Sequence, residues 1–240
     1  MSASKKSIND QKAIIRAKGE RALTWHNVPH TGVITITGFR GMGKTALAWW
    51  LTDELRNTPG FPSRVATYMA PNGADKVLPT WAHTNFTSVK EVFESERDSN
   101  KMGYIIVIDE AVFTNNARRA MSKENVEFMQ LFALCRQKGH LIIFIAQDSN
   151  QMDVAIIDQT DMLLMKKPSA MQVKRGRATL KEQLNEAFVQ INEKQEPRAW
   201  VYAYDPMTDA SKLLKSQMPV WWTDKVSTMY GDMTLGLDEE

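Results

Sequence analysis

The chain has one cysteine, Cys135, in 240 residues, so it can form no internal disulfide bond. It also lacks an apolar run of the roughly 20 residues that a membrane-spanning helix needs, and its N-terminus has no apolar signal region. Its charges nearly cancel, with 30 basic and 28 acidic residues, so the overall charge favours neither nucleic acid nor a membrane surface as a partner. We expect a soluble intracellular protein whose function depends on local motifs.

Metal-ligand spacing is absent among the four histidines, and the sequence contains neither an internal repeat nor a low-complexity segment. A hydrophobic content of 43% is enough for a substantial core. We therefore expect one α/β domain over residues 30–210, preceded by a basic arm, residues 1–29, and followed by a tail, residues 211–240. The paired tryptophans are interpreted as packing residues: Trp49, Trp50, Trp221 and Trp222.

What the chain does contain is a glycine-rich motif between a β-forming run and a helix-forming run. Residues 38–45 read Gly-Phe-Arg-Gly-Met-Gly-Lys-Thr, which matches the phosphate-loop pattern G-x-x-x-x-G-K-T. The glycines let successive N–H groups, together with the N-terminus of the following helix, converge on the phosphates of a nucleotide. The residues predicted to bind ATP are Gly38, Phe39, Arg40, Gly41, Met42, Gly43, Lys44, Thr45 and Ala46.

Two side chains of this loop and two acids have predicted roles. Lys44 is expected on the β- and γ-phosphates, and Thr45 on Mg²⁺. Residues 103–110 predict a strand that is buried on both faces and ends in Asp109 and Glu110. Asp109 is expected to hold the Mg²⁺ shell through water, and Glu110 to accept a proton from the attacking water.

A second buried strand, residues 141–146, ends next to Gln147, an uncharged group suited to sensing the γ-phosphate. Phosphoryl transfer also needs positive charge on its transition state, often from an arginine of a neighbouring subunit. The candidates are Arg136, near the end of the preceding helix, and Arg118 and Arg119, in the polar loop after the acids.

The remaining patterns complete an alternation of strands and helices. Further strands are predicted at residues 64–69, 162–165 and 200–204, and helices at residues 89–97, 122–138 and 178–192. The densest basic stretch, residues 166–177, follows the strand at 162–165, which is interpreted as the last strand of the sheet. Its basic residues are Lys166, Lys167, Lys174, Arg175 and Arg177.

The series formed by residues 38–45, residues 105–110 and residues 135–147 resembles the FtsK–HerA superfamily of DNA-pumping ATPases. In that family a helix ending in Arg, a Gly, an apolar strand and a terminal Gln follow the Asp-Glu strand. The small chain and its closing Pro-Val-Trp-Trp, residues 219–222, look most like the genome-packaging ATPases of membrane-containing double jelly-roll viruses. One departure is the strand at 64–69, which lacks the acid often found at its end.

The resemblance implies a RecA-like P-loop NTPase of the additional-strand, catalytic-Glu type, with a mainly parallel central sheet flanked by helices. The Gln147 strand would separate the phosphate-loop strand from the Asp109 strand. It also implies a homo-oligomeric ring of five or six subunits around double-stranded DNA, in the host cytoplasm or the virion, with a capsid or portal vertex protein as docking partner. A motor that ignores base sequence grips phosphates, so the expected DNA contacts are Lys174, Arg175, Arg177, Arg118 and Arg119.

Three alternatives stay open. Zonula-occludens-toxin-like phage morphogenesis ATPases share much of this pattern but usually carry a membrane span, which places them second. A P-loop small-molecule kinase would use residues 174–177 as a lid, although Glu110 directly after Asp109 argues against it. A nucleotide-gated binding protein would switch partners without acting as a motor. DNA-stimulated turnover would separate the motor from the last two.

Overall fold

The computed structural model describes residues 23–109, 123–146 and 154–229 of the chain. Four residues with predicted roles lie outside these ranges: Glu110, Arg118, Arg119 and Gln147. Most of the predicted N-terminal arm, residues 1–22, lies outside them as well.

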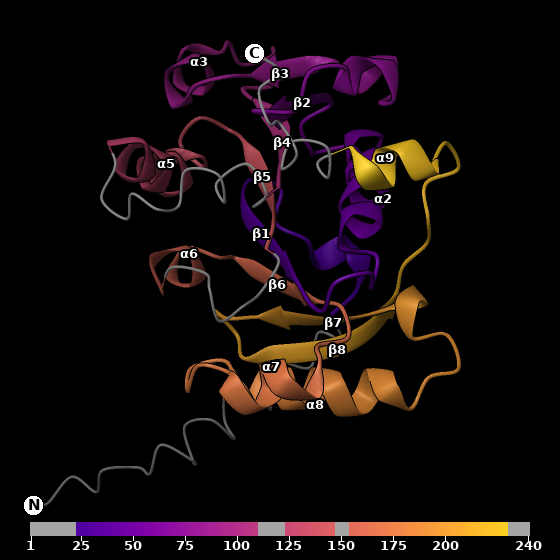
Figure 1. Ribbon diagram of the computed structural model, residues 1–240. Helices are drawn as coiled ribbons and strands as arrows, with labels where there is room; N and C mark the ends of the chain where they lie inside the picture. Colours follow the sequence, from indigo (N-terminus) through magenta and orange to yellow (C-terminus); the bar gives the residue numbers. More distant parts are fainter. Residues whose placement is uncertain (1–22, 110–122, 147–153, 230–240) are drawn as a thin grey trace, which may run out of the picture.

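One sheet of eight strands runs through the described residues in the order β3-β2-β4-β5-β1-β6-β7-β8 (Figure 1). The first six strands in this order are parallel, whereas β7 is antiparallel to β6 and β8 is antiparallel to β7. The mainly parallel sheet is therefore confirmed, with β5 between β1 and β4 as expected. The strands are β1 Gly32–Thr37, β2 Arg64–Tyr68, β3 Thr84–Phe86, β4 Tyr104–Asp109, β5 Leu141–Ile145, β6 Met162–Met165, β7 Trp200–Asp205 and β8 Ala210–Lys215.

The central strands are apolar at nearly every position because both faces of the sheet are covered. In β5, Leu141 and Ile143 belong to the core on one face, and Ile142 and Phe144 to the core on the other. Strands buried on both faces need no polar alternation, which is why these runs are continuous in the sequence.

Helices cover both faces of the sheet (Figure 1). Helices α2 and α9 lie on one face, α3, α5 and α6 on the other, and α7 and α8 pack near β6 and β7. In the described ranges, none of the helices has both the length and the apolar character required to cross a membrane. The helices are α2 Lys44–Arg56, α3 Val89–Glu94, α5 Lys123–Leu134, α6 Val154–Asp158, α7 Ala170–Arg175, α8 Lys181–Asn192 and α9 Asp224–Thr228, with short 3₁₀ turns η1 Trp25–Asn27, η2 Ala74–Lys76, η3 Thr80–Ala82 and η4 Pro197–Ala199.

The sheet continues beyond β6, so the interpretation of residues 162–165 as its last strand is wrong. Strands β7 and β8 form an antiparallel hairpin at the edge. The expected tail from residue 211 onward begins inside β8. This strand reads Ala-Ser-Lys-Leu-Leu-Lys and is largely exposed, as expected for an edge strand, so its sequence lacks the apolar run that marks the central strands.

The C-terminal segment packs against α2 through tryptophan side chains. Trp49 of α2, Trp81 of η3 and Trp221 contact one another edge-to-face, with ring centroids between 5.7 and 6.2 Å apart. The Nε1 of Trp221 also donates to Asp53 Oδ2 at 3.0 Å. The interpretation of Trp49 and Trp221 as packing residues is confirmed, and Val226 and Met229 from the same C-terminal segment belong to the buried core on the α2 side.

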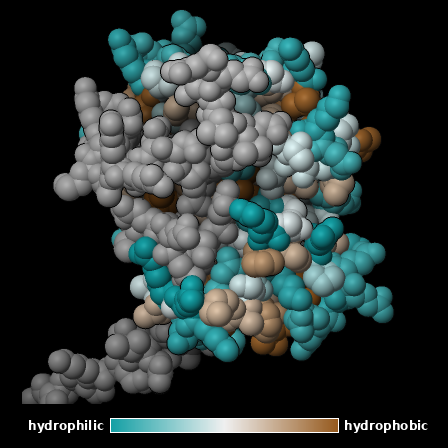
Figure 2. Space-filling model, viewed as in Figure 1, coloured by the Kyte–Doolittle hydropathy of each residue, from teal (hydrophilic) through white to brown (hydrophobic). Residues whose placement is uncertain are grey.

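The exposed apolar side chains of the described residues are spread over several elements. Figure 2 shows hydrophilic residues around small, separate hydrophobic patches on one face. Phe39, which is 50% exposed, is the one that belongs to the phosphate loop. The others are Leu134, Met171, Val189, Met207, Met218 and Val220.

Candidate active site

The glycine-rich motif forms the connection between β1 and α2. Gly41 and Gly43 have φ angles of 75° and 83°, in the left-handed region that glycine adopts without strain. A Cβ atom on either would meet no atom within 4 Å, so both positions favour glycine for conformation rather than for space. Gly43 is also the N-cap of α2 and gives no side-chain hydrogen bond to the first turn. The positive end of α2 therefore opens onto this loop without a side-chain cap.

Gly38, the first glycine of the motif, packs closely against Lys166, the residue that follows β6. A Cβ atom here would lie 2.7 Å from the carbonyl oxygen of Lys166 and 2.8 Å from its Cβ. The Lys166 N–H donates to Thr37 O at 2.8 Å, and the Phe39 N–H donates to Lys167 O at 3.1 Å. The ladder between β1 and β6 thus continues into the phosphate loop, and only glycine allows this close approach.

Lys44 lies over the loop that it ends. Its Nζ donates to Gly38 O at 2.9 Å and to Phe39 O at 3.3 Å. Thr45 follows it in the first turn of α2 and is half-buried. Phosphate oxygens can replace these carbonyls as acceptors, so the ammonium group is placed to bind a nucleotide.

Asp109 ends β4 at the same edge of the sheet as the phosphate loop. It is 6% exposed and lies in register with Ile145 of β5, which in turn pairs with Ile36 of β1. The loop begins two residues after Ile36. The predicted metal-shell carboxylate and the predicted phosphate site therefore share the carboxyl edge, where open α/β sheets bind ligands. Glu110 follows Asp109 outside the described residues.

The predicted Mg²⁺ donors fit an ion that arrives with its nucleotide. In the described part of the chain, no group of three or more His, Cys, Asp or Glu side chains could hold a metal ion alone. Mg²⁺ usually takes one or two protein oxygens and completes its shell with waters and substrate phosphates. Thr45 and Asp109 supply protein oxygens of this kind.

Arg136 lies at the opposite, amino edge of the sheet. Its guanidinium forms an ion pair with Asp161, which directly precedes β6. Asp161 also accepts the Val33 N–H, near the start of β1, at 2.8 Å. The phosphate loop follows the other end of β1, so Arg136 is not part of the site of its own chain. Its action on a neighbouring subunit stays a prediction.

The composition of residues 166–177 suggested one continuous basic surface, but the structure shows that these basic residues do not form one. Lys166 is only 2% exposed, and the Nζ of Lys167 donates to Asn192 Oδ1 at 2.6 Å. These two lysines lie beside the phosphate loop. A lysine inside the protein is not available to DNA, and Lys166 is not among the predicted DNA contacts.

The three cations predicted to bind DNA lie farther along. Lys174 and Arg175 are exposed in the last turn of α7, and Arg177 is half-buried. Residues 179–180, which follow, line a pocket at the amino end of β6. From the sequence, we expect all of residues 166–177 at the carboxyl edge of the sheet, where β5 ends before Gln147. In the structure, only the first residues of this stretch lie at that edge.

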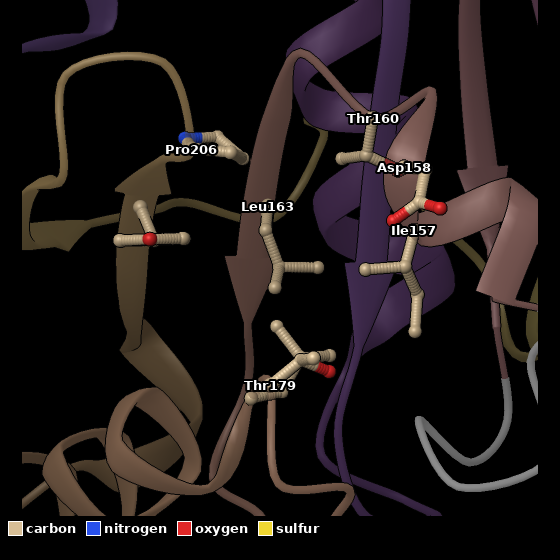
Figure 3. Close-up of a pocket in the computed structure, with 8 residues that line it drawn as sticks. Ile157, Asp158, Thr160, Leu163, Thr179 and Pro206 are labelled. Atoms are coloured by element: carbon tan, nitrogen blue, oxygen red, sulfur yellow. The ribbon is translucent and has the colours of Figure 1, made fainter.

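The pocket has a volume of about 440 Å³ (Figure 3). Figure 3 shows Leu163 of β6 between Ile157 and Pro206. Burial and the nearby Asp209 carboxylate raise the pKa of Tyr204 to about 12, so its hydroxyl stays protonated at neutral pH. This hollow lies across the sheet from the phosphate loop and has no part in the predicted nucleotide site. It is lined by Ile157, Asp158, Thr160, Leu163, Thr179, Leu180, Tyr204 and Pro206.

Comparison with known families gives one match. The family model for zonular occludens toxin (Zot) matches residues 32–168. The match begins at β1 and ends just after β6, so it contains the phosphate loop, Asp109 and the strand between them. No curated protein sequence matches the chain.

Solved structures share the fold at low sequence identity. The genome packaging NTPase B204 from Sulfolobus turreted icosahedral virus 2, in complex with ATP-gammaS, is 14% identical with a TM-score of 0.51, over 78% of this chain and 98% of that one. The cytoplasmic domain of the type VII secretion ATPase EccC from Thermomonospora curvata is 14% identical with a TM-score of 0.53, over 87% and 28%. The N-terminal domain of zonular occludens toxin from Neisseria meningitidis is 16% identical with a TM-score of 0.42, over 82% and 97%.

The predicted P-loop ATPase fold is confirmed by these structures. The family model that matches is that of the toxin-like ATPases, which the sequence analysis placed second for lack of a membrane span. The family match rests on the nucleotide-binding core at residues 32–168 and needs no such span. The matched region is more than half of the 240 residues. The chain therefore belongs to the zonular occludens toxin (Zot) family.

Proposed function

We propose that the chain binds ATP with Mg²⁺, hydrolyses it, and uses the reaction to move double-stranded DNA. The observation that carries this proposal is the shared carboxyl edge, where the phosphate loop after β1 and Asp109 at the end of β4 lie one strand apart. Loop glycines, a helix N-terminus, a lysine and a buried carboxylate are the groups that phosphoryl transfer to water requires.

Each residue has one task in this proposal. Lys44 and the loop amides bind the β- and γ-phosphates, and Thr45 and Asp109 hold the Mg²⁺ shell. Bound Mg²⁺ supplies positive charge that offsets the charge developing on the phosphate oxygens. Glu110 takes a proton from the attacking water, and Gln147 contacts the γ-phosphate; both assignments rest on their positions after β4 and β5 in the sequence.

The choice of DNA as the partner is supported by the fold and by the chemistry of the chain's cations. B204, which shares the fold, is a genome packaging NTPase. We propose packaging of a viral genome by a homo-oligomeric ring that docks on a capsid or portal vertex protein. The family match at residues 32–168 favours a second function, an ATPase of phage morphogenesis. Both functions use the same nucleotide site.

The test measures ATP hydrolysis with and without double-stranded DNA for the wild type, Lys44→Ala and Glu110→Gln. DNA should stimulate the wild type. Lys44→Ala should lose nucleotide binding, because it removes the ammonium from the phosphates, whereas Glu110→Gln should bind ATP and fail to turn it over. Hydrolysis by Glu110→Gln at the wild-type rate would show that the proton acceptor is another group.

The wild-type result separates the function classes. Turnover that rises with DNA supports the motor, and turnover that requires a small phosphate acceptor supports a kinase. Slow hydrolysis that ignores both additions supports a nucleotide-gated binding protein. Electron microscopy with an ATP analogue and duplex DNA then tests the assembly, since a translocating ring should enclose DNA in a central channel.

A further inference from the structure

Strand β8, at one edge of the sheet, has a row of backbone groups that β7 does not use (Figure 1). The Ser216 N–H donates to Ala199 O at 2.8 Å, which identifies the even-numbered residues of β8 as those that bond to β7. The odd-numbered residues direct their N–H and C=O groups away from the sheet. Within the described residues, those of Ser211 and Leu213 have no backbone partner on that side.

The lysines of β8 restrict what can pair with this edge. Lys212 and Lys215 are exposed, and Trp25 Nε1 donates to Lys215 O at 2.9 Å, so η1 occupies only one end of the edge. Like charges on opposite strands destabilise a pair, which disfavours a second β8. The same repulsion disfavours the N-terminal arm, because residues 5–21 carry six basic and two acidic residues. An acidic strand fits this edge better.

The C-terminal tail of the chain has the sequence of such a strand. Residues 232–238 read Asp-Met-Thr-Leu-Gly-Leu-Asp, in which apolar residues alternate with polar or small ones. An alternation of period two is typical of a strand with one buried face. Residues 230–240 also contain no basic residue and four acids, Asp232, Asp238, Glu239 and Glu240.

The two faces of β8 match the two rows of the tail. Leu213 is half-buried and packs against the core cluster on the α8 side. Lys212 lies on the opposite face, because side chains alternate along a strand. A paired tail whose apolar row extends the core beside Leu213 therefore brings Asp232 and Asp238 to the face of Lys212, where opposite charges on adjacent strands attract.

The tail is too short to pair with this edge in its own chain. Trp221 contacts Trp81 of η3, which packs beside β2, and Figure 1 shows α9 well away from β7 and β8. Six strand spacings of about 4.8 Å, roughly 29 Å, separate β2 from β8. Residues 230–240 span at most about 38 Å, so a tail that crossed the sheet would keep only about three residues for pairing.

We propose that the acidic tail of one copy pairs with the β8 edge of the next copy, so that each subunit gives a strand to one neighbour and receives one from the other. A head-to-tail contact of this kind closes into a ring when its rotation permits. The strand exchange deepens the proposed ring and in that respect rests on the proposed function, although it needs no bound nucleotide.

Analytical ultracentrifugation of the full chain measures the assembly. Deletion of residues 231–240 should weaken self-association at least about tenfold, because the pairing strand is lost. Leu213→Pro should have the same effect, since it removes an N–H that would bond to the tail. Both variants should melt close to the wild type, because this N–H points away from β7 and proline is tolerated at such an edge position.

A charge exchange tests the identity of the two strands. Lys212→Glu with Lys215→Glu should weaken the assembly, because the edge then repels the acidic tail. Adding Asp238→Lys with Glu239→Lys in the same chain should restore it.

Hydrogen exchange separates the tail from other occupants of the edge. In the wild type, protection of the Ser211 and Leu213 amides should rise with protein concentration and disappear when the tail is deleted. The control Lys76→Glu with Lys90→Glu, at exposed sites elsewhere, should match the wild type.

Three results would overturn the strand exchange: no concentration-dependent protection, self-association that ignores the tail deletion, or protection that depends on residues 1–22 instead. Assembly through the tail without ATP hydrolysis would overturn the proposed function and leave this interface in place.

Discussion

The two edges of the sheet each hold a cation, but they hold it in different ways. At the carboxyl edge, the ammonium of Lys44 is bound to the backbone carbonyls of Gly38 and Phe39, which ligand oxygens can replace. At the amino edge, the guanidinium of Arg136 is neutralised by Asp161, which also accepts the N–H of Val33. The first arrangement suits exchange of a ligand, whereas the second joins a loop to the start of a strand.

The glycines at the two edges also differ in how much space surrounds them. Gly41 and Gly43 have open space beside them, in keeping with a loop that a ligand approaches. Gly32, at the amino edge, is enclosed by the side chains of Asp161 and Arg136. The comparison teaches that the backbone beside the phosphate loop is left accessible to a ligand, whereas at the amino edge the side chains of Asp161 and Arg136 fill the space beside the start of β1.

The largest effect is expected from Lys44→Ala at the carboxyl edge. Nucleotide affinity should fall at least about 100-fold, because a charge-assisted contact to the phosphates is lost. The melting temperature should stay close to that of the wild type, since the side chain is partly exposed. Titration with a fluorescent ATP analogue measures the loss, and Lys76→Ala, an exposed lysine of η2, is the matched control. Equal affinity in both variants would contradict the site.

The second effect concerns the predicted DNA contacts Lys174, Arg175 and Arg177, which precede the pocket residues at the amino end of β6. Replacing Lys174, Arg175 and Arg177 by Ala together should weaken DNA binding equally for all sequences and flatten its salt dependence by up to about three phosphate contacts. Basal ATP hydrolysis should survive, because these residues lie away from the phosphate loop. If the DNA affinity and its salt dependence do not change, Arg118 and Arg119 become the better candidates for the DNA contacts.

The third effect tests whether the amino edge acts on a neighbouring subunit. Arg136→Ala and Lys44→Ala chains, each inactive in this prediction, are mixed in equal amounts. If Arg136 acts in trans, about a quarter of the interfaces should combine an intact site with an intact arginine and regain hydrolysis. An absence of recovery, in subunits shown by native mass spectrometry to mix, would leave Arg136 with its ion pair as its only role.

The fourth effect is a pH dependence of stability. The folded state binds its Lys166 proton less tightly than the unfolded chain does, because burial lowers the pKa from 10.5 to about 8. The unfolded state therefore holds more protons between these values, and wild-type stability should rise with pH there by up to about 3 kcal/mol relative to Lys166→Met. Urea unfolding at pH 7.5, 9 and 10.5 measures the difference. A constant difference across this range would show that the amine is not desolvated.

The smallest effect separates the partners of the amino-edge ion pair. Asp161→Ala should destabilise the fold by about 1 to 2 kcal/mol, because the buried N–H of Val33 loses its acceptor. Arg136→Ala should cost less than about 1 kcal/mol, since its side chain is more than half exposed at 57%. Thermal unfolding at equal ionic strength measures both. A larger cost for Arg136→Ala would show that the charge pair, rather than the backbone contact, stabilises this edge.

The sequence by itself determined the phosphate loop and the central strands, because both depend on local chemistry. The spacing of the glycines, Lys44 and Thr45 sets a backbone conformation within a few residues, and continuous apolar runs identify strands buried on both faces. It also identified the strand between β1 and β4, through resemblance to a family whose strand order it shares. The edge strand β8 was missed, because its two leucines stand between exposed Ser and Lys residues and form no long apolar run.

Only the tertiary structure decided which charged residues meet a ligand and which meet the protein. Arg136 and Asp161 are 25 positions apart, and the acceptors of Lys166 are 32 and 50 positions away. In the sequence, Lys166 looks like the other basic residues of the stretch at 166–177. Its neighbours in the sequence do not show that this lysine is buried while Lys174 and Arg175 are exposed. Burial is created by chain segments that arrive from elsewhere, so the same residue type becomes a surface cation in α7 and an interior amine beside the phosphate loop.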